Sequence, residues 1–267
     1  MTNEQYHSSP GYSKSHLDDI AGAPIDYWHA RLNKDREPEE PSRALVLGQA
    51  IHTAILEPDL FPTEYKILPD LDLRTKNGRA ERDAFVAANP GSTIITIDER
   101  DTAIACQNAV RRHPVASLLF TDGRVEQSFF TIDQETGELI KCRMDWWRES
   151  AGMVVDVKST DDASEDGFGK SAAKFRYHLQ PPWYQDVLRQ EYGEAPPYWV
   201  FLAIEKKPPY KIGLYYPTAE DIQLGHAMAR RDFKKILECK ASGRWPDYAT
   251  EVRPLKLPGW YKRKADL

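Results

Sequence analysis

The sequence has few cysteines and no long hydrophobic run. Its three cysteines, Cys106, Cys142 and Cys239, are far apart and form no CxxC pair. This argues against a secreted disulfide scaffold and against a cysteine-built zinc or iron–sulfur site. The longest mostly apolar stretch, residues 44–56, is interrupted by polar residues, whereas a membrane span needs roughly 20 apolar residues. The polar N-terminal residues lack the apolar core of a signal peptide, so we expect a soluble protein of the reducing cytoplasm.

The chain also lacks an excess of positive charge. It carries 36 Lys and Arg against 41 Asp and Glu, a formal net charge of −5, which is not the charge of a generic polyanion binder. The charge is uneven, because residues 230–267 hold 11 basic and 5 acidic side chains. This basic C-terminal segment is either a solvated helix face with a frayed tail or a surface that faces phosphate groups.

The first part of the chain is predicted to be mainly helical. At 267 residues the chain can form one large domain or two small ones. A charged, proline-containing loop is expected at residues 33–41 and a short strand at 92–96. Capping residues and hydrophobic spacing indicate helices at residues 13–32, 42–56, 78–88 and 98–112.

The middle of the chain changes to the periodicity of strands. The expected strands span residues 125–132, 139–147, 153–158, 198–204 and 211–216. The first two form a hairpin, and the third is more buried. A mobile loop is expected at residues 159–169, then a helix to about Tyr192, and a final helix begins at a capping box at Thr218. This order favours an α/β or α+β domain over a bundle or a sandwich.

Three charged residues lie on two neighbouring strands of the expected sheet. Asp145 ends one strand, and Asp156 and Lys158 lie on the next. Residues two apart on a strand face the same side, so Asp156 and Lys158 project together while Val157 points into the core. Converging carboxylates suit Mg²⁺ or Mn²⁺, and a lysine beside them can position or deprotonate the attacking water. The alternative is an inert ion pair, but the apolar run 153–155 predicts a buried strand, where an unpaired carboxylate is costly.

Two helices add polar residues at a spacing of four. Gly48 and His52 share a helix face, where the glycine allows close approach of another backbone and the imidazole projects from an otherwise apolar helix. Gln180 and Tyr184 present an amide and a phenol along one face, suited to a phosphate or to metal-bound water. In isolation, the histidine is more often a satisfied core residue, and the Gln–Tyr pair is ordinary for a helix surface.

The indoles of Trp146 and Trp147 directly follow Asp145. If the substrate is a nucleic acid, they are candidates for stacking on an unpaired base at its end. Adjacent strand residues face opposite sides, so at least one of the two is expected in the core.

The order of these motifs resembles that of the PD-(D/E)xK nuclease superfamily, in its RecB-like branch and more closely the RecE (exodeoxyribonuclease VIII) type of phage and prophage recombination exonuclease. GxxxH, a carboxylate at a strand end, Asp-x-Lys on the next strand and QxxxY on the following helix occur in sequence, and the opening GYSKSHLDDIAGAPIDYWHARL is similar to the N-terminal motif of this group. The resemblance covers about residues 12–204. It implies one domain over residues 1–267 with a restriction-endonuclease-like α/β fold, a central mixed β-sheet flanked by helices, and a basic C-terminal helix and tail from about residue 218.

The resemblance implies a role for each motif residue. The implied ligands of a divalent metal, Mg²⁺ with Mn²⁺ as a substitute, are His52, Asp145, Asp156 and the carbonyl of Val157. Lys158 would orient and activate water. Gln180 and Tyr184 would position the scissile phosphate or support Lys158. Glu126, on the preceding strand, is a weaker candidate for a second metal or for the 5′ end.

The activity implied by the resemblance is Mg²⁺-dependent digestion of linear double-stranded DNA from 5′ to 3′. The 3′ single strand would serve a RecT-like annealing protein in a bacterial cell, with the nuclease encoded by a phage or prophage. Ring-forming relatives imply a homo-oligomer, a tetramer or alternatively a trimer, in which a few inward basic residues hold DNA and the basic C-terminal segment is a candidate for lining the passage. Iron–sulfur relatives have a cysteine where this chain has Ala23 before Pro24, so no cluster is expected. The rival functions are a selective endonuclease on the same fold and a non-catalytic DNA-binding module.

Overall fold

The computed structural model describes residues 1–37, 39–249, 251–258 and 261. The chain forms two compact units, the first comprising Met1–Lys14 and Pro38–Ala229 and the second comprising Ser15–Glu37 and Arg230–Leu267. Within the basic C-terminal segment, residues 250, 259–260 and 262–267 lie outside the described residues. A search of the described chain finds no helix with the length and hydropathy needed to cross a bilayer.

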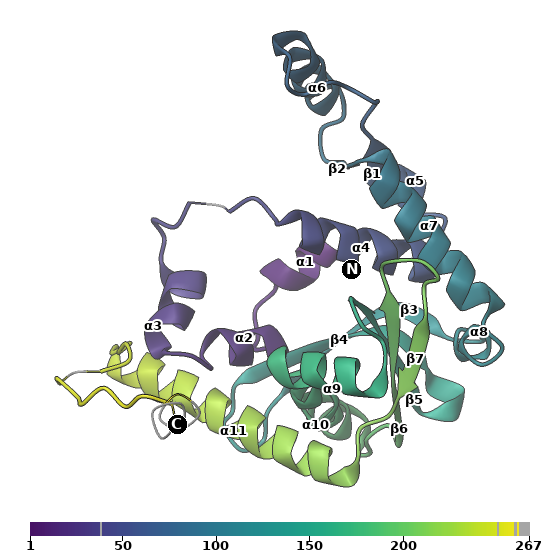
Figure 1. Ribbon diagram of the computed structural model, residues 1–267. Coiled ribbons are helices and arrows are strands. Elements are labelled where there is room, and N and C mark those ends of the chain that lie inside the picture. The colour runs from purple at the N-terminus through teal and green to yellow at the C-terminus, as the bar shows by residue number, and fades with distance from the viewer. Residues whose placement is uncertain (38, 250, 259–260, 262–267) are drawn as a thin grey trace. The chain divides into compact units, whose positions relative to one another are not determined.

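A five-stranded mixed sheet forms the centre of the first unit (Figure 1). Its strands are β3 (Arg124–Ile132), β4 (Leu139–Arg148), β5 (Met153–Thr160), β6 (Tyr198–Glu205) and β7 (Ile212–Tyr215), in this spatial order. The β5–β6 pair is parallel and the other neighbouring pairs are antiparallel. The hairpin and the buried third strand predicted from the sequence are therefore confirmed, with β5 in the middle of the sheet.

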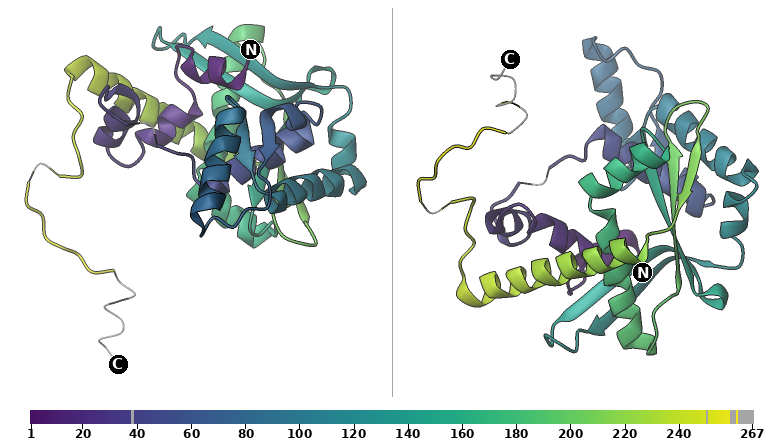
Figure 2. Two further views of the ribbon diagram at one scale, coloured as in Figure 1. Left: turned by 90° about the horizontal axis from the view of Figure 1, so that it is seen from above. Right: turned by 60° about the horizontal axis from the view of Figure 1, so that its bottom comes forward.

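Helices cover both faces of this sheet, as the right-hand view of Figure 2 also shows. The main ones are α4 (Arg43–Leu56), α7 (Ile97–Arg112), α9 (Glu165–Lys174) and α10 (Gln180–Tyr192). On one face, α4 and α7 pack on β5 and β6 in a core that includes Ile51, Cys106 and Val157. On the other face, the α10 residue Trp183 is buried and its indole N–H donates to the carbonyl of Lys141, 3.2 Å away. The α9–α10 segment makes the crossover that a parallel β5–β6 pair requires.

Shorter elements complete the first unit. They are α1 (Asn3–Ser8), α5 (Phe61–Glu64), α6 (Lys76–Ala88), α8 (Ala116–Leu119), the 3₁₀ turns Glu149–Ala151 and Tyr177–Leu179, and the parallel pair β1 (Tyr65–Ile67) and β2 (Thr93–Ile95). The α1 segment is fixed to β4 by Lys141, which is 1% exposed and whose Nζ donates to the carbonyls of Tyr6 and Ser9, each 2.6 Å away. This buried cation thus helps to hold the N-terminal helix against the sheet.

The second unit contains a correction to the sequence prediction. A single helix over residues 13–32 is wrong, because the chain forms α2 (Lys14–Asp19), α3 (Pro24–Tyr27) and a π-helix at Trp28–Leu32. Pro24 is the first residue of α3, and Ala23 before it is extended with φ −134° and ψ 150°, as expected for a residue that precedes proline. Tyr27 stacks on Trp245, with ring centroids 5.2 Å apart, beyond the end of α11 (Ala219–Ser242).

The segment after β5 contains two further corrections. Residues 159–169 are not one mobile loop, because β5 continues to Thr160 and α9 begins at Glu165 with Ser164 as its N-cap. The serine and acidic residues are the start of a helix rather than a loop. The helix expected up to Tyr192 is also interrupted at Arg176, whose φ is 56°.

Other helix predictions are confirmed. Ser42 caps α4, since its side chain accepts from the N–H of Leu45. The capping box at Thr218 is formed with Asp221, whose N–H donates to the threonine hydroxyl oxygen 3.1 Å away. The helix expected from Asp98 begins one residue earlier, after Thr96.

Candidate metal and hydrolysis site

The site lies where β4 and β5 separate. The two strands are paired from Arg148↔Met153 to Trp146↔Val155, and the backbone pairing ends there. Beyond this point, the N–H of Val157 on β5 donates to the side chain of Asp145 on β4 rather than to a backbone carbonyl. The acceptor is Oδ2 of Asp145, 2.8 Å away. A buried N–H needs an acceptor, and here that acceptor is a site residue. The predicted convergence of Asp145 with the Asp-x-Lys strand is therefore confirmed.

Glu126 lies across β3–β4 from Asp145. The ladder pairs Val125 with Trp146 and Gln127 with Met144 but skips Glu126, whose φ is 52°. A non-glycine residue seldom adopts this left-handed conformation, which is strained and concentrates at functional sites. The local distortion brings the Glu126 side chain to Asp145, and the sequence offers no sign of it.

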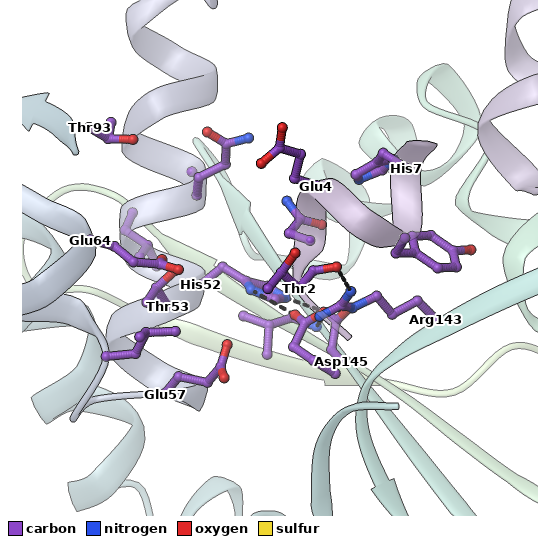
Figure 3. A pocket seen from close by; sticks show the side chains of 18 of the residues that line it. Thr2, Glu4, His7, His52, Thr53, Glu57, Glu64, Thr93, Arg143 and Asp145 are labelled. Atoms are coloured by element: carbon purple, nitrogen blue, oxygen red, sulfur yellow. Dashed lines mark hydrogen bonds and ion pairs between the residues drawn. The ribbon is translucent and has the colours of Figure 1, made fainter. Parts of the chain in front are cut away.

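His52 joins these two carboxylates from α4 (Figure 3). Its Nε2 is 3.0 Å from Asp145 Oδ2 and its Nδ1 is 3.5 Å from Glu126 Oε1. Burial would lower the pKa of His52, but the two carboxylates outweigh it and raise the pKa to about 9. One ligand atom from each of the three residues lies within 4.8 Å of the others, a spacing that a single cation can bridge.

Gly48 allows α4 to approach β5, as its spacing from His52 predicts. A Cβ at this position would lie 3.3 Å from the Ser159 Oγ. The neighbour is thus a side chain of β5 rather than another backbone. A Cβ at position 48 would therefore require the Ser159 hydroxyl to shift by a few tenths of an ångström.

Asp156 and Lys158 form the second part of the site. Asp156 is 1% exposed, and its Oδ2 is 2.5 Å from the Nζ of Lys158, so the two side chains do project together. Burial raises the pKa of Asp156 to about 6 against the opposing effect of Lys158. Burial would lower the pKa of Lys158, but Asp156 and Asp145 raise it overall, so this lysine carries a charge.

Gln180 and Tyr184 stand behind this ion pair on α10. The Gln180 Nε2 donates to Asp156 Oδ1 and also lies 3.4 Å from the Tyr184 hydroxyl oxygen. Both residues are buried. The amide therefore orients Asp156, a role the sequence did not suggest.

The structure groups the predicted ligands differently from the sequence. His52 and Asp145 meet Glu126, the candidate ranked lowest, whereas the two oxygens of Asp156 face Lys158 and Gln180. A ligand role for Asp156 and for the Val157 carbonyl remains a prediction. Because Asp156 interacts electrostatically with both His52 and Asp145, it still belongs to the same charged group.

Two further residues of the site were missed in the sequence. Arg143 is two residues before Asp145 on β4; its Nε donates to Glu126 Oε2 and its Nη1 donates to the carbonyl of Thr2, 3.0 Å away. The two-residue spacing was the available signal, because it places both side chains on one face. Tyr177 lies with its ring centroid 5.0 Å from Lys158 Nζ, three residues before Gln180, and no spacing rule pointed to it.

Most of these groups line one cleft of about 1090 Å³, whereas Asp156 and Gln180 are buried and are not among its lining residues. The cleft is lined by His52, Glu126, Asp145, Lys158 and residues 1–7 of the N-terminal segment. Figure 3 labels Thr2 and Arg143 in this cleft, where Arg143 on β4 donates to the carbonyl of Thr2. Neither Trp146 nor Trp147 is among the lining residues. Trp147 is buried and Trp146 packs against the core, which does not support stacking of either indole on DNA.

Residues 13–258 match the family model described as "PDDEXK-like domain of unknown function (DUF3799)", and the chain belongs to this family. No curated protein matches the sequence. Among solved structures, one from Eubacterium rectale, described as a candidate exonuclease, is similar over 100% of this chain and 99% of its own, with a TM-score of 0.66 and 19% identity. At this identity the likeness shows the fold. The fold class is thus PD-(D/E)xK, and family and site together support a nuclease-type hydrolase.

The donors of the site suit a divalent cation. One imidazole and two carboxylates lie within reach of a single ion, and carboxylate oxygens are hard ligands that favour Mg²⁺ or Mn²⁺. Protonated His52 offsets the negative charges of Asp145 and Glu126. A bound cation would offset these charges instead. PD-(D/E)xK nucleases generally use a divalent metal, and these residues fit one.

Proposed function

We propose that this chain is a Mg²⁺-dependent exodeoxyribonuclease that degrades linear double-stranded DNA. The observation that carries the proposal is that His52, Glu126 and Asp145 lie in the same cleft as Lys158. A carboxylate cluster alone would fit a structural cation. A charged lysine beside it adds a group that can hold water against a phosphate.

The cation would be held by His52, Glu126 and Asp145, with Asp156 and the Val157 carbonyl as further candidate donors. When bound, it supplies positive charge against the charge that develops on the phosphate. Lys158 would then orient the attacking water, because its ammonium is fixed by Asp156 Oδ2 and remains protonated. Because a protonated amine cannot accept a proton, Lys158 would position the water rather than deprotonate it. Gln180 keeps Asp156 in place from the other side.

The finer function follows from the motif order that resembles RecE-type enzymes. We propose 5′ to 3′ polarity, 3′ single-stranded products for a RecT-like annealing protein, and a homo-oligomeric ring that encloses DNA in the cytoplasm of a bacterium. A ring explains how a chain with a net charge of −5 can retain a polyanion. DNA enclosed by a ring is kept from dissociating, so fewer basic contacts are needed to hold it.

The test is digestion of linear, nicked and covalently closed circular duplex DNA, each with and without Mg²⁺. The proposal predicts loss of the linear DNA alone, and only with the metal. Cleavage of the closed circle would establish an endonuclease on the same fold. DNA binding without cleavage of any substrate would establish a non-catalytic module.

A further inference from the structure

Phe175 is an exposed aromatic residue beside the candidate site. It is 50% exposed and follows the last residue of α9, two positions before Tyr177, which lines the cleft. Phe168 in the same segment is 4% exposed and packs against Tyr177 and Tyr215. Phe175 is therefore exposed, whereas Phe168 nearby is buried.

The Phe175 ring belongs to a stacked column that leads to the active-site lysine. Its centroid is 5.7 Å from that of Tyr177, with the ring planes 22° apart. Lys158 Nζ lies 5.0 Å from the Tyr177 centroid. Arg176 between the two aromatic residues has a φ of 56°, a strained conformation that turns the chain where the rings stack. The column therefore connects the protein surface to the catalytic cleft.

Two further lysines lie beside this column. Lys174 Nζ is 5.2 Å from the Phe175 centroid. Lys14 Nζ is 5.9 Å from the Tyr177 centroid and donates to the Phe175 carbonyl, 2.9 Å away. Cations that follow a backbone and an exposed ring that stacks on bases are the combination that binds single-stranded nucleic acid.

We propose that Phe175 stacks on an unpaired base of the DNA strand that enters the cleft, while Lys174 and Lys14 contact phosphates of that strand. The proposal rests on the proposed function for the identity of the ligand as DNA, and it adds a binding site outside the metal cluster. It assigns to Phe175 the stacking role that the sequence suggested for Trp146 and Trp147. Because intact duplex has no unpaired base, this platform favours frayed ends.

The experiment measures binding of a fluorescein-labelled single strand of about 12 nucleotides to the full chain in EDTA, by fluorescence anisotropy. A set of strands, each with one abasic position, identifies the base that stacks. Phe175→Leu should bind the intact strand about 5- to 100-fold more weakly and should no longer distinguish the abasic strands. Phe175→Trp should restore both properties, because it keeps an aromatic face.

Tyr216→Leu is the matched control. Tyr216 is 80% exposed and follows β7, outside the Phe175–Tyr177 stack, so its variant should bind like the parent. Lys174→Ala should reduce the slope of log K against log salt by about 0.7, the value for one phosphate contact on a single strand. Circular dichroism of each variant verifies folding.

Binding of the intact strand by Phe175→Leu within two-fold of the parent would overturn the platform, as would equal loss in Phe175→Trp. The parent is assayed in parallel for Mg²⁺-dependent cleavage of linear duplex, which separates the two proposals. If the parent binds through Phe175 but cuts no DNA, the platform holds and the nuclease function fails. If it cuts DNA and Phe175→Leu binds normally, the platform alone fails.

Discussion

At the residue scale, substitution of Lys158 distinguishes a catalytic site from a cluster of charges without catalytic function. Its ammonium is fixed by Asp156, and a protonated amine has no lone pair to offer a metal ion. Lys158→Ala should therefore still bind Mg²⁺ and linear duplex but cleave it at least about 100-fold more slowly, the lower end for loss of an assisting group. Single-turnover digestion of end-labelled duplex at saturating Mg²⁺ measures this.

The matched control for that substitution is Lys207→Ala. Lys207 is exposed and is not among the cleft-lining residues, so its variant should cut at the parental rate. A Lys158→Ala rate within a few-fold of the parent would contradict the catalytic assignment, because an ion pair without a catalytic role leaves the rate unchanged.

Metal binding can also be tested by substitution of single residues. Asp145→Ala should abolish measurable Mn²⁺ binding, because it removes the carboxylate that contacts both His52 and the β5 backbone. Asp156→Ala should also weaken binding, since less negative charge remains near the ion. Isothermal titration calorimetry with Mn²⁺ tests each variant, with thermal unfolding to show that it is folded. Parental affinity in both variants would place the metal elsewhere.

The metal-free protein should lose stability as the pH rises. The pKa of His52 is raised from 6.5 to about 9 by Asp145 and Glu126 in spite of burial. A raised pKa in the folded state means that protonated His52 stabilises the fold below pH 6.5, and this contribution is lost as the pH passes about 9. His52→Gln should lack this part of the pH dependence, on the order of 1 to 3 kcal/mol. Urea unfolding of both proteins in EDTA at several pH values gives the difference, and identical curves would refute it.

At the scale of elements, α1 forms a wall of the cleft because β4 holds it. Lys141 and Arg143 donate from β4 to carbonyls of residues 1–9. Lys141→Met would leave the carbonyls of Tyr6 and Ser9 without this donor, at about 1 to 3 kcal/mol of unfolding free energy. Hydrogen exchange of the α1 amides should become faster. Lys207→Met is the control, and unchanged exchange in Lys141→Met would show that α1 is held by other contacts.

How far the sequence predicts each element depends on how local its cause is. The cap at Ser42 and the strand run around Val155 have local causes, and both were found. Pro24 interrupts a periodic pattern that otherwise indicated one helix, and the Ser164 cap was hidden in a segment with the composition of a loop. Asp145 and Asp156 were identified because adjacent strands bring them together. The position of Glu126 depends on a backbone φ of 52°, which no residue pattern encodes.

At the scale of the whole molecule, the assembly state follows from the proposed ring. Each chain has a mass of 30.6 kDa, so sedimentation velocity can distinguish a monomer from a trimer or tetramer. We expect a closed oligomer at the concentrations at which DNA is degraded. A monomer that degrades long linear duplex without dissociating would contradict the ring.

The most direct test of the site and its function is digestion of linear and covalently closed duplex with Mg²⁺ by the parent and by Asp145→Asn. This variant keeps the size of the side chain and removes its charge. We predict that the parent degrades the linear DNA and spares the circle, while Asp145→Asn, folded and able to bind DNA, degrades neither. Equal digestion by the two proteins, or no Mg²⁺-dependent cleavage by the parent, would contradict the assignment of this site as the catalytic centre of a nuclease.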